Sequence, residues 1–351
     1  MMEIEVPVID ADGHLFEEDA ALAEYLPPPY RGRPRFKTYP FFPTLDGFPR
    51  GMAVAGKVPE TPPSVWMEFL ERNHIQKAVL YPTAGLAAGL ILDRDWAVAV
   101  SRAYNDWLYD RYTRDHPQLL GVALLPVQDP EEAARELRRA KTELGFVAGL
   151  LPAVTALHRG YGASDFDPIY RAAEELDVGL AVHGAPSRGL GFDFLPTFIQ
   201  VHTLEHPVAL LIQLTSMLFE GVFDRFPKLR VAFLEAGSGW LPYFIDRTEE
   251  EFEKPYRFQA PKMRRSPREV LTSGQVWVTA EVEERLLPYT LQLCNQDAVM
   301  WPSDFPHERL PDAFSRDLPT LLGRQDLSEE QKRKILWDNP CRFYGIGPEG
   351  R

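Results

Sequence analysis

Residues 299–307 read VMWPSDFPH, an apolar run that ends abruptly in a carboxylate, a proline turn and a histidine. Near the other end of the chain, residues 6–14 read VPVIDADGH and end in the same manner. Short apolar runs of this kind are typical of buried strands. Ionisable groups that directly follow buried strands are typical of the rim of a functional site. The two stretches therefore indicate a fold that brings distant strand ends together.

Short apolar runs alternate with longer amphipathic runs along the whole chain. Eight of them are candidate strands, because they are mostly continuous in Val, Leu, Ile and Ala, as expected for strands covered on both faces. They span residues 5–10, 77–82, 119–127, 146–152, 178–183, 229–235, 275–280 and 298–304. The candidate helices span residues 64–73, 93–115, 130–143, 165–176, 201–225, 240–253, 282–294 and 328–343.

Eight strands alternating with eight helices predict an α/β protein, a (β/α)8 TIM barrel. A doubly wound open sheet is the alternative, but its first strand is normally followed by a glycine-rich phosphate turn, and residues 10–14 (DADGH) are not one. We expect a single domain over residues 1–351 with long insertions after strands one and five. Residues 26–63, rich in Pro, Gly and aromatic residues, are expected to form a lid over the barrel mouth.

Composition and charge exclude several classes of protein. With 351 residues, 45% of them hydrophobic, the chain can bury a large core. The two cysteines, Cys294 and Cys341, form neither a disulfide framework nor a zinc-ribbon pattern. A formal net charge of -13 argues against a nucleic-acid partner. No apolar run approaches the length of a membrane span, and no leader segment is recognisable, so we expect a cytoplasmic protein.

The predicted barrel indicates where the functional site lies, because catalytic groups in such barrels lie at the C-terminal ends of the strands. Those ends carry Asp10, Asp12, His14, His183, Glu235, Glu281 and Asp304. Imidazole and carboxylate together suit a divalent ion of borderline hardness. We therefore expect one or two ions of zinc, manganese or iron.

These residues, in this order, resemble the amidohydrolase superfamily, in the branch that includes aminocarboxymuconate-semialdehyde decarboxylase and the resorcylate-type decarboxylases. The resemblance covers nearly the whole chain. It rests on IDADGH at residues 9–14, VHG at 182–184, GVFDRFPKL at 221–229, GWLPY at 239–243 and SDFPH at 303–307. The segment from 221 to 243 is its most specific part.

The resemblance implies a metal site and assigns its ligands. Asp12 and His14 fall on the family's first-strand pair, and His183 falls on its strand-five ligand. Asp304 matches the strand-eight aspartate that binds the metal or handles the proton of its water. The branch usually has a histidine after strand six, where this chain has Glu235. Glu235 is therefore either a ligand, to the same or a second metal, or the general base.

Four further residues are candidates for contacts with the substrate. His202 and His206 are four residues apart on a predicted helix and share a face, so they suit a ligand or substrate contact as well as a packing role. His307 is expected to line the rim or to orient Asp304. Arg188, in the loop after strand five, is a candidate partner for a substrate carboxylate.

Three functions remain open for this protein, each involving a small molecule. We expect a metal-dependent hydrolase acting on an aromatic or acyl compound through metal-activated water, because the strand-six glutamate adds a base and a negative charge that disfavour an anionic acid. The alternative is a metal-dependent non-oxidative decarboxylase (carboxy-lyase) of an aromatic or unsaturated acid. The second alternative is a non-catalytic ligand-binding barrel.

The apolar helical stretch 208–223 favours packing on the barrel or a subunit interface, and we expect a homodimer.

Overall fold

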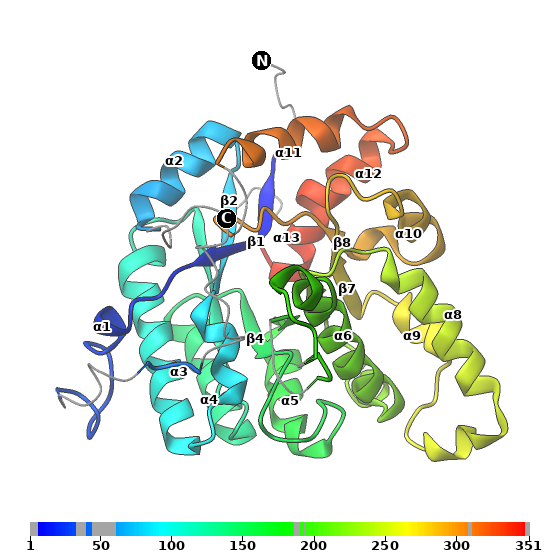
Figure 1. The fold of residues 1–351 in the computed structure, drawn as a ribbon, viewed down its shortest axis with the longest axis horizontal. Coiled ribbons are helices and arrows are strands. Elements are labelled where there is room, and N and C mark those ends of the chain that lie inside the picture. Colours follow the sequence, from blue (N-terminus) through cyan, green and yellow to red (C-terminus); the bar gives the residue numbers. More distant parts are fainter. Residues whose placement is uncertain are drawn as a thin grey trace.

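The computed structural model describes residues 6–32, 40–43, 61–185, 190–192, 194–307 and 311–347. Eight parallel strands follow one another in sequence order around a barrel, with helices on the outside (Figure 1). The expected (β/α)8 TIM barrel is confirmed. Its strands are β1 Ile9–Leu15, β2 Lys77–Pro82, β3 Leu119–Leu124, β4 Ala148–Pro152, β5 Gly179–His183, β6 Val231–Leu234, β7 Val276–Thr279 and β8 Val299–Met300.

The helices largely follow the predicted pattern. They are α1 Asp19–Leu22, α2 Pro63–Asn73, α3 Arg94–Leu108, α4 Pro130–Glu143, α5 Asp167–Leu176, α6 Phe198–Phe219, α7 Val222–Arg225, α8 Trp240–Glu253, α9 Pro267–Leu271, α10 Leu287–Leu293, α11 Pro311–Gly323, α12 Glu329–Arg333 and α13 Asn339–Tyr344. Three of them, α1, α9 and α11, were not expected. The stretch expected as one helix over residues 201–225 is divided between α6 and α7, because Gly221 adopts a φ of 69° that ends the helix.

Helix α4 illustrates how local sequence produces an element of this outer layer. The Asp129 side chain accepts a hydrogen bond from the Glu132 amide, and a proline occupies the first helical position. Apolar residues at helical spacing, Ala133, Leu137 and Ala140, are buried. The helix therefore begins at a capping residue and packs its apolar face on the strands.

Strand β1 begins later than expected, at Ile9 rather than at residue 5, and continues to Leu15. The sequence pattern was misleading because Asp12 and His14 were assigned to a loop after a strand that was expected to end at Asp10. All of β1 is buried, and it pairs with β2 from Ile9 opposite Lys77 to Leu15 opposite Pro82. Its polar side chains are therefore carried on a strand inside the barrel.

The seam between β1 and β8 is closed by individual hydrogen bonds. The Ala11 amide donates to the Trp301 carbonyl at 3.0 Å, and the Asp304 amide donates to the Asp12 carbonyl at 3.0 Å. The buried Asp10 carboxylate accepts from the Ser303 amide at 2.8 Å and from the Ser303 hydroxyl at 2.6 Å. These bonds fix the chain after β8 against β1, and with it the position of Asp304.

The long insertion after β1 is described only in part. Phe41 and Phe42 are buried, and the Phe41 carbonyl accepts a hydrogen bond from the Trp96 indole of α3 at 3.3 Å. Residues 33–39 and 44–60 lie outside the described residues, so the lid stays a prediction. No helix in the described part of the chain is both long and apolar enough to cross a membrane, and the cytoplasmic location also stays a prediction.

Candidate metal centre

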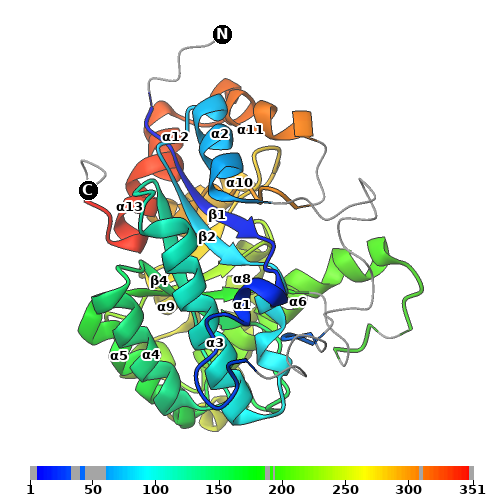
Figure 2. The same cartoon turned by 90° about the vertical axis from the view of Figure 1, so that its left-hand side faces the viewer.

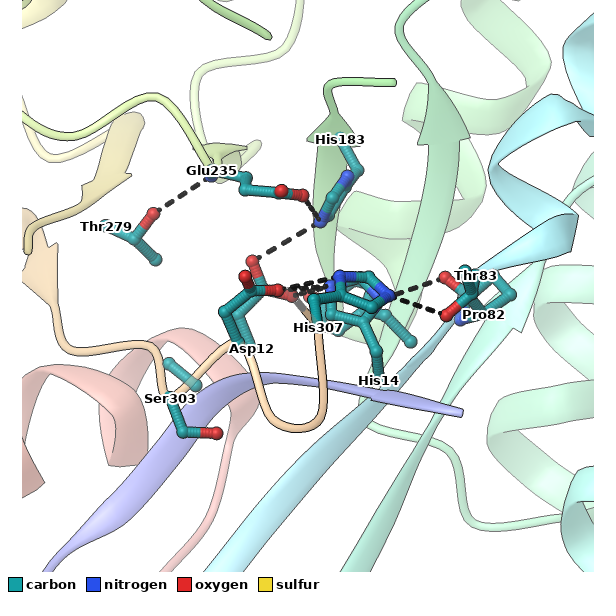
Figure 3. A network of polar contacts seen from close by, with 12 residues as sticks. Asp12, His14, Pro82, Thr83, His183, Glu235, Thr279, Ser303 and His307 are labelled. Carbon is teal, nitrogen blue, oxygen red and sulfur yellow. Dashed lines mark hydrogen bonds and ion pairs between the residues drawn. The ribbon is translucent and has the colours of Figure 1, made fainter. Parts of the chain in front are cut away.

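Ionisable side chains from four strands converge at one end of the barrel (Figure 3). Asp12 and His14 project from β1, His183 is the last residue of β5, and Glu235 follows β6 directly. Asp304 lies in the segment that follows β8. The donor atoms of these side chains form two overlapping sets, and within each set all donor atoms lie within 4.8 Å of one another. The sets are Asp12–His14–His183 and His14–Glu235–Asp304–His307. The structure thus brings together all five of the expected metal ligands.

The distances between these donors match a coordination sphere better than a hydrogen-bond network. His183 Nε2 is 3.4 Å from Asp12 Oδ2 and 3.3 Å from Glu235 Oε2. His14 Nε2 is 3.5 Å from Asp12 Oδ1 and 3.6 Å from Asp304 Oδ1. Hydrogen bonds between nitrogen and oxygen are shorter, about 2.7–3.2 Å. Ligands held at about 2.0–2.2 Å from one ion are separated by roughly 3.0–3.6 Å in octahedral or tetrahedral geometry.

Two backbone carbonyls decide which nitrogen of each histidine carries a proton. His14 Nδ1 is 3.0 Å from the Pro82 carbonyl, and His183 Nδ1 is 2.6 Å from the Gly184 carbonyl. Because a carbonyl oxygen only accepts, both Nδ1 atoms donate. In the neutral rings the lone pairs of Nε2 then point at the carboxylates. This is the arrangement of metal-bound histidines, and a cation between them removes the repulsion between these electron-rich atoms.

Burial adds to the electrostatic case for a cation. Asp12, His14 and His183 are almost completely buried. Burial raises the pKa of the Asp12 carboxyl, His183 lowers it, and the neighbouring Asp304 raises it further. Burial also raises the pKa of Asp10 to about 7, against the hydrogen bonds from Ser303. Carboxylates removed from water are costly unless compensated, so the residues present fit a divalent metal ion.

His307 contacts Asp304, His14 and Thr83. Its Nδ1 lies 2.8 Å from Asp304 Oδ1, and its Nε2 lies 2.7 Å from Thr83 Oγ1. Its ring stacks on the ring of His14 at 4.0 Å between centroids. His307 is therefore held on three sides, in a position to orient Asp304. Thr83, which follows β2, was not singled out from the sequence.

The backbone of two site residues adopts an uncommon conformation. Glu235 has a φ of 61° and Asp304 a φ of 53°, in the left-handed region that residues other than glycine seldom enter. Such residues cluster at functional sites, where the surrounding structure holds them in place. The Glu235 amide donates to the Thr279 hydroxyl of β7 at 3.2 Å. The fold thus imposes the direction in which both carboxylates point.

Helix α6 supplies a further group of donors beside Glu235. His206 Nε2 is 3.3 Å from Glu235 Oε1 and 3.6 Å from Glu205 Oε1, and His202 Nε2 is 3.9 Å from Glu205 Oε1. Glu205 was missed from the sequence, although the H-x-x-E-H pattern of residues 202–206 carries the signal. Arg188 lies outside the described residues. Glu281 is exposed.

The fold and the donor groups define a metal-binding barrel, and comparison with known proteins gives its family. The amidohydrolase family model matches residues 9–346. The chain belongs to this family, and it is an enzyme.

The similar proteins include two curated relatives and one solved structure. The chain is 26% identical to 2-amino-3-carboxymuconate-6-semialdehyde decarboxylase of Dictyostelium discoideum, over 82% of this chain and 77% of the relative. It is 26% identical to gamma-resorcylate decarboxylase of Polaromonas sp. (strain JS666 / ATCC BAA-500), over 80% of this chain and 86% of the relative. The structure of 5-carboxyvanillate decarboxylase of Novosphingobium aromaticivorans with bound manganese has a TM-score of 0.75 at 22% identity, covering 97% of this chain and 98% of that one.

These comparisons contradict the expectation of a hydrolase. Both curated relatives are decarboxylases and match most of this chain. The preference for hydrolysis was therefore wrong. It treated the negative charge of Glu235 in isolation, whereas the structure places Glu235 between two histidines, His183 and His206, each 3.3 Å away. Charge at this position is shared within a larger donor group and does not by itself disfavour an anionic substrate.

Proposed function

We propose that this enzyme is a divalent-metal-dependent, non-oxidative decarboxylase of a small aromatic or unsaturated carboxylic acid. The observation that carries the proposal is the convergence of Asp12, His14, His183 and Asp304 at coordination distances in the barrel mouth. The decarboxylase relatives support the reaction, and the manganese in the 5-carboxyvanillate decarboxylase structure supports that metal among the candidates.

Exposure divides the roles among the site residues. The side chains of His14, His183 and Asp12 are at most 2% exposed, whereas that of Glu235 is 13% exposed and that of Asp304 is 26% exposed. The buried three would hold the metal on one side, and a substrate can reach the other two. The bound ion would polarise oxygen atoms of the substrate as a Lewis acid.

Asp304 is the proposed proton donor. During decarboxylation the bond between the substrate carbon and its carboxylate breaks, carbon dioxide leaves with neither electron of that bond, and the substrate carbon takes a proton in its place. Asp304 supplies this proton from its carboxyl group, which His307 orients at 2.8 Å. Solvent reprotonates Asp304 through its exposed edge. Glu235, whose Oε2 lies 3.3 Å from His183 Nε2, is the proposed further metal ligand.

The test uses enzyme loaded with Mn²⁺ and a panel of acids that covers the relatives' chemistry: dihydroxybenzoates, 5-carboxyvanillate and aminocarboxymuconate semialdehyde. We expect carbon dioxide release from at least one acid and, in D₂O, one deuterium at the carbon that carried the carboxylate. Asp304→Asn should keep the metal but lose at least about 100-fold in kcat, the low end for a general acid. Metal-loaded enzyme that releases no carbon dioxide from the whole panel would refute the proposal.

A homodimer also stays a proposal. Its support is the exposed apolar surface of α6, where Ile199, Leu204 and Ile212 are 75%, 39% and 44% exposed. Sedimentation of the purified chain at several concentrations tests it, and a monomer at all of them would contradict it.

A further inference from the structure

A second group of metal-binding side chains lies beside the first, on α6. It consists of His202, Glu205 and His206, whose donor atoms all lie within 4.8 Å of one another. The three residues come from one face of a single helix, since spacings of three and four residues place side chains together. Figure 2 shows α6 on the side of the barrel toward which β1 and β2 point. The group lies at the same barrel end as the first one, because His206 Nε2 is 3.3 Å from Glu235 Oε1.

Glu235 connects the two groups through its two carboxylate oxygens. Oε2 is 3.3 Å from His183 Nε2 in the first group, and Oε1 is 3.3 Å from His206 Nε2 in the second. A carboxylate that presents one oxygen to each of two donor groups is arranged as a bridging ligand. The left-handed backbone of Glu235 holds it in this orientation.

The distances in the second group are slightly longer than those in the first. His206 Nε2 is 3.6 Å from Glu205 Oε1, and His202 Nε2 is 3.9 Å from the same oxygen. Both exceed a hydrogen bond of about 2.7–3.2 Å; the first lies at the upper end of the roughly 3.0–3.6 Å expected between ligands of one ion, and the second lies just beyond it. The Glu205 carboxylate is fully buried beside both imidazoles, and this combination of carboxylate and imidazole donors suits a divalent cation.

Gly184 allows α6 to approach the end of β5 this closely. A Cβ atom at Gly184 would lie 2.6 Å from His206 Nδ1 and 2.8 Å from His206 Cα. No larger residue fits there without displacing the helix. The absence of a side chain at Gly184 therefore lets His206 pack against the end of β5, and this contact brings the two donor groups together.

We propose that His202, Glu205 and His206 form a second divalent-metal site, linked to the first by Glu235 as a bridging ligand. Two imidazoles with one or two carboxylates suit zinc, manganese or iron. The second site binds its ion more weakly than the first, because the His202 side chain is 32% exposed whereas His14 and His183 are fully buried. The proposal does not depend on which reaction the enzyme catalyses.

The experiment titrates metal-free enzyme with Mn²⁺ alone and measures bound metal by elemental analysis. The wild type is expected to bind about two equivalents in two steps, and Glu205→Gln and His202→Ala about one. His116→Gln removes a histidine far from α6 in sequence and should keep both. Electron paramagnetic resonance should show a coupled Mn²⁺ pair in the wild type that Glu205→Gln and Glu235→Gln both lose.

Two outcomes would overturn the second site. One is a single equivalent in the wild type at saturating Mn²⁺ and also at saturating Zn²⁺. The other is two equivalents retained by both Glu205→Gln and His202→Ala. Circular dichroism and thermal midpoints confirm folding, and because His202 is partly exposed, its variant remains informative if loss of the buried Glu205 disrupts the helix. Metal stoichiometry is independent of carbon dioxide release, so this proposal and the proposed reaction can fail separately.

Discussion

His307 Nδ1 lies 2.8 Å from Asp304 Oδ1, and Thr83 Oγ1 lies 2.7 Å from the other nitrogen of the same ring. The Nδ1–H group donates a hydrogen bond to the carboxylate and Nε2 pairs with the Thr83 hydroxyl, so both polar ends of the ring are fixed. This places a buried histidine directly behind the carboxyl group that we propose as proton donor. His307 acts on the reaction through Asp304, as a positioning residue.

Replacing His307 should therefore impair turnover more than binding. His307→Ala is expected to lower kcat by about 10–100-fold, the usual effect of removing an orienting partner in a metal site, with a smaller change in KM. His307→Asn, which can still donate to Asp304, should recover part of the rate. The pH profile of kcat should also shift in His307→Ala. An unchanged kcat and an unchanged pH profile would show that His307 only fills space.

Removing a buried ligand should remove the metal and, with it, stability. In Asp12→Ala both histidines lose the carboxylate that lies 3.4–3.5 Å from their Nε2 atoms. We expect at least one equivalent of metal to be lost. For wild-type protein, saturation at 100 times Kd adds about 2.7 kcal/mol to the free energy of unfolding, so a chelator should lower its Tm. Asp12→Ala should have a low Tm that the chelator lowers less than it lowers the Tm of the wild type, and an equally large chelator effect on both proteins would contradict the assignment.

The barrel seam should depend on Asp10. Its carboxylate accepts two hydrogen bonds from Ser303, and Asp10→Ala would leave the buried Ser303 amide without this acceptor. An unsatisfied buried donor costs about 1–3 kcal/mol, and we expect a loss of that size in the free energy of unfolding, measured with urea. Ser303→Ala keeps the hydrogen bond from the residue-303 amide to Asp10 and should lower the free energy of unfolding by less. An equal loss of stability in the two variants would show that only the hydrogen bond from the hydroxyl contributes.

Glu17 predicts a pH dependence of stability away from the metal ligands. Burial raises the pKa of its carboxyl to about 7 from an ordinary 4.5, against hydrogen bonds from the amides of Gly85, Thr83 and Ala84. Between these values the folded state binds more protons than the unfolded state, so stability falls as pH rises. The stabilising contribution is complete below about pH 4.5 and is lost as pH rises through about 7.

The matched variant is Glu17→Gln, which cannot titrate. Urea unfolding of both proteins at pH 5 and pH 8 should show that the wild type loses more stability than the variant over this interval. Asp10, whose pKa is also raised to about 7, is present in both and cancels from the comparison. If the variant lost as much as the wild type, the pKa of Glu17 in the folded protein would have to be ordinary.

The sequence by itself determined the barrel and located most residues of the candidate metal centre. Continuous apolar runs specify strands covered on both faces, and their alternation with amphipathic runs specifies parallel strands with outer helices. Once that fold is accepted, a residue that ends such a run must lie at the barrel mouth. His183, Glu235 and Asp304 were located by this reasoning, which needs only local periodicity and the chain order.

Only the tertiary structure decided how those residues are combined. The end of β1 could not be read from the sequence, because its polar residues Asp12 and His14 are buried where the segment after β8 pairs with the strand. His206 comes within 3.3 Å of Glu235 because Gly184 lets α6 pack closely on the end of β5, a contact that no periodicity encodes. The role of Glu235 depends on His183 and His206 lying on either side of it. Such contacts depend on strand stagger and helix packing, which residue patterns within single segments do not specify.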